Sequence, residues 1–317
     1  MWERIKRKAL FSRAFRILVR WSKQVRLPGF GGFSLYAISR FFFEALATGR
    51  VETRASAIAF KLFVAFFPAV IVLLTLIPYI PIDDLQAKLL STFQSMLPYE
   101  VYTFVESTLH DLVLKKHGTL LSVSFVVGVY VASNSVNAIL LGFSGSTNLT
   151  TWHTPFKQRM LSLGLLFALT ILVMIAIPVL TISNAVVAWM DEHGHLSSSL
   201  EVLGLFAAKW SILMVLVLAM LGLLYNAGDP SRQRYHWITP GAILALVLIL
   251  VLSKALTFVF SNITDYNALY GSIGAILAVQ LWIYLNMIAL LVGYELNISI
   301  SRARHDHRVE LRPIARS

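Results

Sequence analysis

The sequence predicts an all-α polytopic membrane protein with six transmembrane helices, and three observations lead to this fold class. Of the 317 residues, 57% are apolar and 14% are charged, whereas about 25% are charged in an ordinary soluble domain. The mean hydropathy is +0.72. Six stretches have the roughly 20 apolar residues that are needed to cross a bilayer. The chain has no cysteine, which excludes disulfides, thiolate metal sites and cysteine nucleophiles.

The chain begins with a basic segment. Residues 1–26 alternate basic and apolar side chains, a pattern that favours contact with anionic lipid at the membrane surface over stacking and phosphate contacts with RNA. No apolar region with a small-residue cleavage site follows directly, so a removable signal peptide is not expected. The net charge of +11 is therefore assigned to membrane lipid, and no nucleic acid partner is expected.

Residues 33–48 are too short and too charged to span a membrane, since Arg40 and Glu44 interrupt them. Their apolar residues favour a helix that lies in the membrane interface over a helix packed on the bundle. The lipid-facing side chains of this interfacial helix would be Phe41, Phe42 and Leu46.

The six predicted spans divide the chain into three parts. The spans are residues 55–80, 120–143, 160–187, 202–225, 237–260 and 272–298. They give a basic N-terminal segment at 1–50, a six-helix membrane domain at 51–300 and a basic tail at 301–317. In the first loop, apolar residues recur at helical spacing on both sides of Pro98, which predicts two short amphipathic helices.

The basic residues lie mainly on one side of the predicted membrane domain. Twelve precede the first span, two lie in the second loop, two in the fourth and five in the tail, so that this side holds 21 of the 27. Cytoplasmic loops carry the excess of lysine and arginine. Both termini are therefore expected in the cytoplasm, and an even number of spans requires the same sidedness for the two ends.

Four segments carry a resemblance to a known family. They are RASAIAFKLFVAFFPAVIVLL at 54–74, WITPGA at 237–242, YGSIGA at 270–275 and LWIYLNMIALLVGYELN at 281–297. Together they resemble the YihY/BrkB family of bacterial inner-membrane proteins. The resemblance implies six transmembrane helices with both ends cytoplasmic, and an association with envelope integrity and virulence. The family also carries an old ribonuclease label that is regarded as a misassignment. Lys61 departs from the family pattern.

Charged residues inside spans are costly and are usually paired or in contact with water. Arg54 begins the first span and Glu295 ends the sixth on the same side, so these two residues are the candidate structural ion pair. Lys209 and Lys254 fall in the outer part of the fourth and fifth spans, near the level of Asp265. These three residues are candidates for a ligand site, and either lysine could instead extend toward the membrane surface.

The second span contains Asn134 and Asn137, which are three residues apart and share one helix face. They either line a polar cavity or form hydrogen bonds with neighbouring helices, which is the commoner use of such residues.

Catalytic and metal sites are not predicted. In the tail, His305, Asp306 and His307 are adjacent residues in a segment that is expected to be disordered. A second group, at 191–195, contains two acidic residues and two histidines that could hold a divalent ion, but a solvated loop is favoured. No cofactor motif is found, and no cofactor is expected.

Two classes of function therefore remain, with a third as a contrast. The first is a transporter or lipid-handling protein of the cell envelope, and the second is a scaffold that transports nothing. The contrast is a ribonuclease, which the carboxylates and histidines support poorly.

Overall fold

The computed structural model describes residues 35–82, 84–96, 99–146, 152–192, 199–230, 235–262 and 272–311, and these residues are almost entirely helical. In chain order the elements are α3 (Leu35–Thr48), α4 (Val51–Leu76), the 3-10 helix η1 (Ile77–Tyr79), α5 (Leu85–Met96), α6 (Tyr99–Leu114), α7 (Gly118–Ser144), α8 (Pro155–Glu192), α9 (Ser199–Ala227), α10 (Pro240–Asn262) and α12 (Ser272–Leu311). The all-α prediction is confirmed. Residues 1–34, which include the segment 1–26 that is predicted to contact anionic lipid, lie outside the described part.

Within the described residues, six helices are long and apolar enough to cross a membrane. They are Val51–Tyr79, Gly118–Ser144, Pro155–Leu180, Gly204–Ala227, Pro240–Phe260 and Ile276–Ala303. Each overlaps one of the six predicted spans, so the predicted number and order of spans are confirmed.

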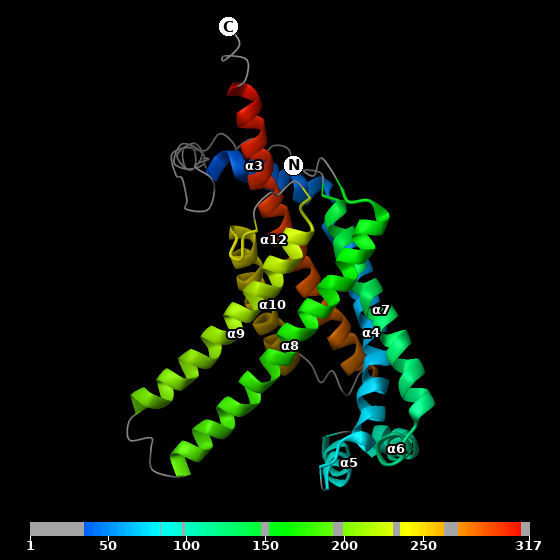
Figure 1. Cartoon of the computed structure of the whole chain (residues 1–317). Helices are drawn as coiled ribbons and strands as arrows, with labels where there is room; N and C mark the ends of the chain where they lie inside the picture. Colours follow the sequence, from blue (N-terminus) through cyan, green and yellow to red (C-terminus); the bar gives the residue numbers. More distant parts are fainter. Residues whose placement is uncertain are drawn as a thin grey trace.

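The helices are held together mainly at one end of the bundle (Figure 1). Helix α4 packs along α7, α8 along α9, and α10 along α12, while α12 also contacts α4. The main hydrophobic cluster joins α4, α7, α8, α9, α10 and α12 around Phe143, Tyr225, Leu291 and Tyr294. We call the helix ends around this cluster the packed end. The start of α3 and the end of α12 also lie there.

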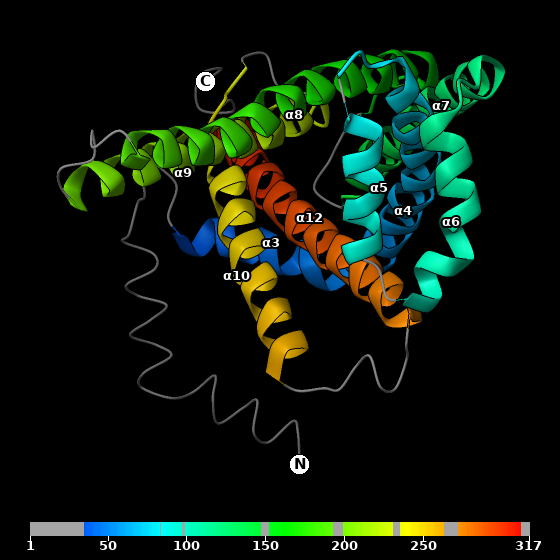
Figure 2. The same ribbon diagram turned by 90° about the horizontal axis from the view of Figure 1, so that it is seen from below.

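The other halves of four helices are not packed in this way. No side chain is buried in residues 166–180 of α8, 204–220 of α9, 246–260 of α10 or 276–285 of α12. We call these segments the open end. Helices α8 and α9 diverge there from α4 and α7 in both views (Figures 1 and 2). A few apolar side chains of these segments are partly buried against the main cluster, namely Leu166, Leu169, Val217, Leu218, Leu246 and Tyr284. The exposed apolar side chains of these segments are left to be covered by lipid or by a bound molecule.

The first loop forms the two helices that its pattern predicts, α5 and α6. They lie at the far end of α4 and α7 (Figure 1). A second hydrophobic cluster fixes them there, formed by Ile77, Leu90, Tyr102, Leu109 and Val113. The α4–α7 pair is thus covered at both ends.

Helix α3 corrects one prediction. Ile38 is 1% exposed and packs with Ile300 and Ala303 of α12, and Phe41 joins this cluster. Leu46 packs against the main cluster. The expectation that Phe41 and Leu46 face lipid is therefore wrong. An amphipathic helix has one apolar stripe, and in α3 this stripe covers the bundle.

The end of α12 corrects a second prediction. The helix continues without interruption to Leu311, so positions 305–307 are helical and not part of a disordered tail. The physical reason is that neither glycine nor proline follows the sixth span until position 313.

Candidate functional site

The structure brings Arg54 of α4 and Glu295 of α12 together at the packed end. The Arg54 Nη2 atom lies 2.6 Å from Glu295 Oε1, and the side chains are 12% and 0% exposed, respectively. A buried carboxylate without a partner is very unfavourable. The pairing of α4 with α12 therefore depends on both residues.

The second oxygen of the Glu295 carboxylate is also bonded. Ser146, two residues after the end of α7, donates a hydrogen bond of 2.6 Å to Glu295 Oε2. Arg54 Nη1 donates to the backbone oxygen of Gly142 in α7 at 2.7 Å. One ion pair thus joins three helices, α4, α7 and α12. Arg54 Nε is buried and has no hydrogen-bond partner among the described residues.

Aromatic side chains are adjacent in sequence to this network, since Phe143 follows Gly142 and Tyr294 precedes Glu295. The rings of Phe143 and Tyr294 stack with centroids 4.1 Å apart. Tyr225 of α9 donates a hydrogen bond of 2.8 Å to the carbonyl oxygen of Leu290, and Tyr294 donates to that of Gly228. These hydrogen bonds satisfy the phenol groups inside the bundle, and they fix the end of α9 to α12.

Helices α10 and α12 touch through two glycines. A Cβ atom at Gly241 would lie 2.0 Å from the Gly293 carbonyl oxygen, and one at Gly293 would lie 2.4 Å from that of Gly241. Beside this contact, Asn297 accepts a hydrogen bond of 2.9 Å from the Gly241 backbone N–H and donates one of 2.9 Å to the Thr239 hydroxyl. Small residues allow such close approach of membrane helices.

The sequence reasoning did not assign roles to Tyr225, Gly241, Gly293, Tyr294 or Asn297. Four of them, all except Tyr225, lie within segments that carry the family resemblance, 237–242 and 281–297. This position was the only signal in the sequence that could have indicated them.

The two asparagines of α7 have different surroundings. Asn137 Oδ1 accepts hydrogen bonds from Gln158 at 2.7 Å and from Ser162 at 3.2 Å, both on α8. Trp152 in turn donates to Gln158. Asn137 therefore joins α7 to α8, as polar residues in membrane helices commonly do. Asn134 is half-buried one turn earlier.

The candidate ligand-site residues Lys209 and Lys254 do not come together in one site within the described part of the chain. Lys209 is half-buried, and its Nζ atom lies 3.4 Å from the Leu180 carbonyl oxygen of α8. Lys254 is exposed on α10. Asp265 lies outside the described residues. The two lysines nevertheless both belong to the open end.

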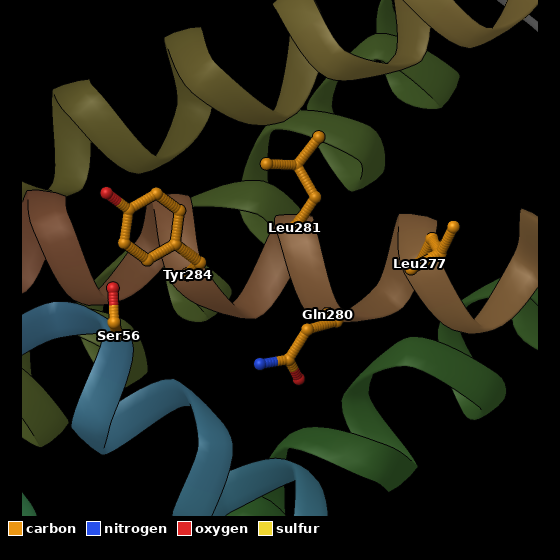
Figure 3. A pocket seen from close by; sticks show the side chains of 5 residues that line it. All are labelled: Ser56, Leu277, Gln280, Leu281 and Tyr284. Atoms are coloured by element: carbon orange, nitrogen blue, oxygen red, sulfur yellow. The ribbon is translucent and has the colours of Figure 1, made fainter.

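An open hollow of about 280 Å³ lies between α4 and α12, lined by Ser56, Leu277, Gln280, Leu281 and Tyr284 (Figure 3). The sequence reasoning did not single out these residues. The available signal was the isolated glutamine in an otherwise apolar stretch of the sixth span.

Metal ligands do not gather in the described part of the chain, where no group of three or more histidine, aspartate and glutamate side chains could hold an ion. The candidate group at 191–195 lies outside the residues whose side chains are described, and so do the side chains of residues 305–307.

Comparisons with known proteins identify the family of this chain. The family model described as "Virulence factor BrkB" matches residues 42–316. The putative ribonuclease-like protein YfkH of Bacillus subtilis is 27% identical over 263 residues, which are 80% of this chain and 91% of that protein. A UPF0761 membrane protein of Stenotrophomonas maltophilia is 23% identical over 287 residues, which cover 87% of this chain and 63% of that protein. No solved structure matches the chain.

The chain therefore spans less than two thirds of that Stenotrophomonas relative, although it spans most of the Bacillus one. The family match extends over all six membrane-spanning helices. This chain belongs to the BrkB family of membrane proteins.

Proposed function

We propose that this protein handles lipid, or another amphipathic molecule, in a bacterial inner membrane, and that it supports envelope integrity by moving that molecule. Both termini would lie in the cytoplasm, as the distribution of basic residues predicts. The packed end would then be the cytoplasmic end of the bundle.

The observation that carries the proposal is the uneven packing of the bundle. The ion pair, the aromatic cluster and the glycine contact fix the helices at the packed end. At the open end, the described parts of α8, α9, α10 and α12 bury no side chain. At the open end, α8 still contacts α9 through Leu180 and Lys209, and α10 contacts α12 through Ser253 and Trp282, but the α8–α9 pair diverges from α4 and α7. Helix pairs that are joined at one end and diverge at the other can admit lipid between them from the bilayer.

The charges of the open end fit an anionic headgroup. Lys209 and Lys254 lie in its segments on α9 and α10. A positive charge in this region is expensive unless it finds a partner. Lys209 already contacts the Leu180 carbonyl oxygen, and an anionic phosphate group would add an opposite charge beside it and beside the exposed Lys254.

A scaffold that transports nothing is the second candidate, and the packed end favours it. A bundle with so many fixed contacts at one end suits a passive structural role, in which α5 and α6 would present a surface to partners. A ribonuclease is the third and least supported candidate. It comes from the name of the Bacillus relative and from the old family label.

The test is lipid movement by the purified protein in liposomes that contain a fluorescent lipid, with chemical quenching of the outer leaflet. We expect faster loss of protected fluorescence than in protein-free vesicles. Lys209→Ala should slow this movement in a protein that still folds, whereas Lys88→Ala, which changes a lysine outside the spans, should not. Wild-type rates equal to those of empty vesicles would reject lipid movement and favour the scaffold.

A further inference from the structure

The hollow between α4 and α12 contains a polar group without a partner. The side-chain oxygen of Gln280 is buried and accepts no hydrogen bond in the described structure. Figure 3 shows the Gln280 carboxamide extending from α12 toward α4, with Ser56 and Tyr284 on one side of it. A buried acceptor without a donor is unfavourable. The oxygen itself is covered in the described conformation, and rotation of the flexible Gln280 side chain would expose it to the hollow. The site would then favour a molecule that brings a donor.

The other polar groups of the hollow are also available. The Ser56 hydroxyl donates to the Glu52 carbonyl oxygen at 2.9 Å, so its oxygen can still accept a hydrogen bond. No hydrogen bond of the Tyr284 hydroxyl is found within the described residues, so that this group can both donate and accept. Leu277 and Leu281 supply the apolar part of the lining.

The hollow has no charge of its own. None of its five lining residues is ionisable near neutral pH, and Arg54, two residues before Ser56 on α4, is already paired with Glu295. An ammonium or a phosphate group bound here would lack an opposite charge, which is costly away from water. The lining therefore matches a neutral group that both donates and accepts hydrogen bonds, which is the chemistry of a hydroxyl.

We propose that this hollow is a binding site for a neutral polyol group, such as a glycerol headgroup, with its hydroxyls on Gln280, Ser56 and Tyr284 and its apolar neighbours on Leu277 and Leu281. The inference rests on the proposed lipid-handling function and names the headgroup chemistry that this function would recognise. In such a lipid the phosphate is bonded directly to the glycerol, and it would remain outside the uncharged lining of the hollow.

The test compares two anionic lipids by native mass spectrometry of the purified full chain. Phosphatidylglycerol carries a terminal diol, and phosphatidic acid with the same acyl chains lacks it. We expect the wild type to retain the first about tenfold better, and Gln280→Leu and Tyr284→Phe to bring the ratio close to one. Tyr130→Phe, which removes an exposed tyrosine hydroxyl in α7, should leave the preference intact.

Three results decide between the possible sources of the polyol. Displacement of phosphatidylglycerol by millimolar free glycerol, lost in Gln280→Leu, would support the polyol chemistry and assign the site to a free polyol. No displacement, together with the preference, would support the lipid headgroup. Equal retention of the two lipids by the wild type, or a preference that survives in Gln280→Leu, would overturn the inference.

This outcome is independent of the liposome assay. A preference that depends on Gln280 in a protein that moves no lipid would keep the site and reject the proposed movement. Lipid movement with no diol preference would do the reverse. Because Gln280→Leu adds no charge and no unpaired polar group, we expect it to fold, and Tyr284→Phe provides a second variant that removes only one hydroxyl.

Discussion

Arg54 and Glu295 are separated by 241 positions in the chain, yet their side chains meet at 2.6 Å inside the packed end. Glu295 is fully buried, and Ser146 bonds its second oxygen. The pair thus lies at the junction of α4, α7 and α12. Its charges balance each other where water is scarce, so that each residue is harmful without the other.

Removing either partner should destabilise the fold. We expect Arg54→Ala and Glu295→Ala each to cost about 3–5 kcal/mol, the usual effect of breaking a buried pair, and to lower the amount of folded protein in the membrane. The double variant should lose less than the sum of the two single losses, because no lone charge remains. Folded yield and thermal unfolding in detergent would measure both effects.

The matched control is Glu52→Ala, which removes an exposed carboxylate from the same helix. It should change stability by less than about 0.5 kcal/mol, as surface substitutions usually do. Additive losses in the Arg54 and Glu295 double variant would show that the two side chains act separately in the membrane.

The spans and the Arg54–Glu295 contact were accessible from the sequence for a simple reason. Hydropathy reports directly on the cost of placing polar groups in lipid, and a charge is so rare in a span that two of them at one depth become natural partners. The approximate ends of the helices also followed from hydropathy.

The uneven packing could not be predicted in this way. In water, a buried helix face is more apolar than an exposed one, but in a bilayer both faces are apolar. Residues such as Leu165, which is buried, and Phe167, which is 64% exposed, are therefore indistinguishable by hydropathy. The contact between Gly241 and Gly293 depends in the same way on a tertiary crossing that no local pattern reports.

The lipid-facing residues of α3 were mispredicted for a related reason. The helical spacing correctly indicated an amphipathic helix, but spacing does not say whether the apolar face meets lipid or protein. Ile300 and Ala303 provide a protein surface for Ile38.

The orientation in the membrane can be tested with single cysteines, because the chain has none of its own. We expect a cysteine at Asp191 to react with a membrane-impermeant maleimide added to intact cells. Cysteines at Lys157 and Ser317 should react only after the membrane is permeabilised. Labelling of Ser317→Cys from outside would place the C-terminus in the periplasm and contradict the proposed topology.

The α6 helix should respond to acid through Asp111. A hydrogen bond from Lys115, 2.7 Å away, and the nearby His117 lower the pKa of Asp111 from its ordinary value of 3.8. A lowered pKa in the folded state means that the ionised carboxylate stabilises the fold above pH 3.8. This contribution falls as the pH drops below 3.8 and is lost once the carboxyl group is protonated in the folded state.

Carboxyl NMR of the protein in nanodiscs would follow this titration. Lys115→Ala should raise the Asp111 pKa toward 3.8, whereas Lys88→Ala, on α5, should leave it where it is. Because Asp111 is exposed, we also expect salt to reduce the difference. An unchanged titration in Lys115→Ala would show that the contact does not form in solution.

The ribonuclease alternative makes a separate prediction. Positions 305, 306 and 307 follow one another on α12, and successive helix positions are about 100° apart around the axis, so that the three do not share a face. We expect the purified protein to show no divalent-dependent RNA cleavage, and alanine at all three positions to leave any residual activity unchanged. Activity that co-purifies with the wild type and disappears in the triple variant would restore this alternative.

The uneven packing itself is testable by distances between spin labels at two pairs of exposed positions on α8 and α10. Val173 and Val251 lie in the open end, whereas Phe156 and Ile243 lie near the packed end. If α8 and α10 are fixed only at the packed end, pulsed EPR should give a narrow distance distribution for Phe156–Ile243 in every lipid mixture. The Val173–Val251 distribution should be broader and should shift when the lipid composition changes, because lipid is then the material between the two helices. Two equally narrow and lipid-independent distance distributions would mean that the bundle is rigid along its whole length. Such rigidity fits a passive scaffold and contradicts a protein that admits lipid between its helices.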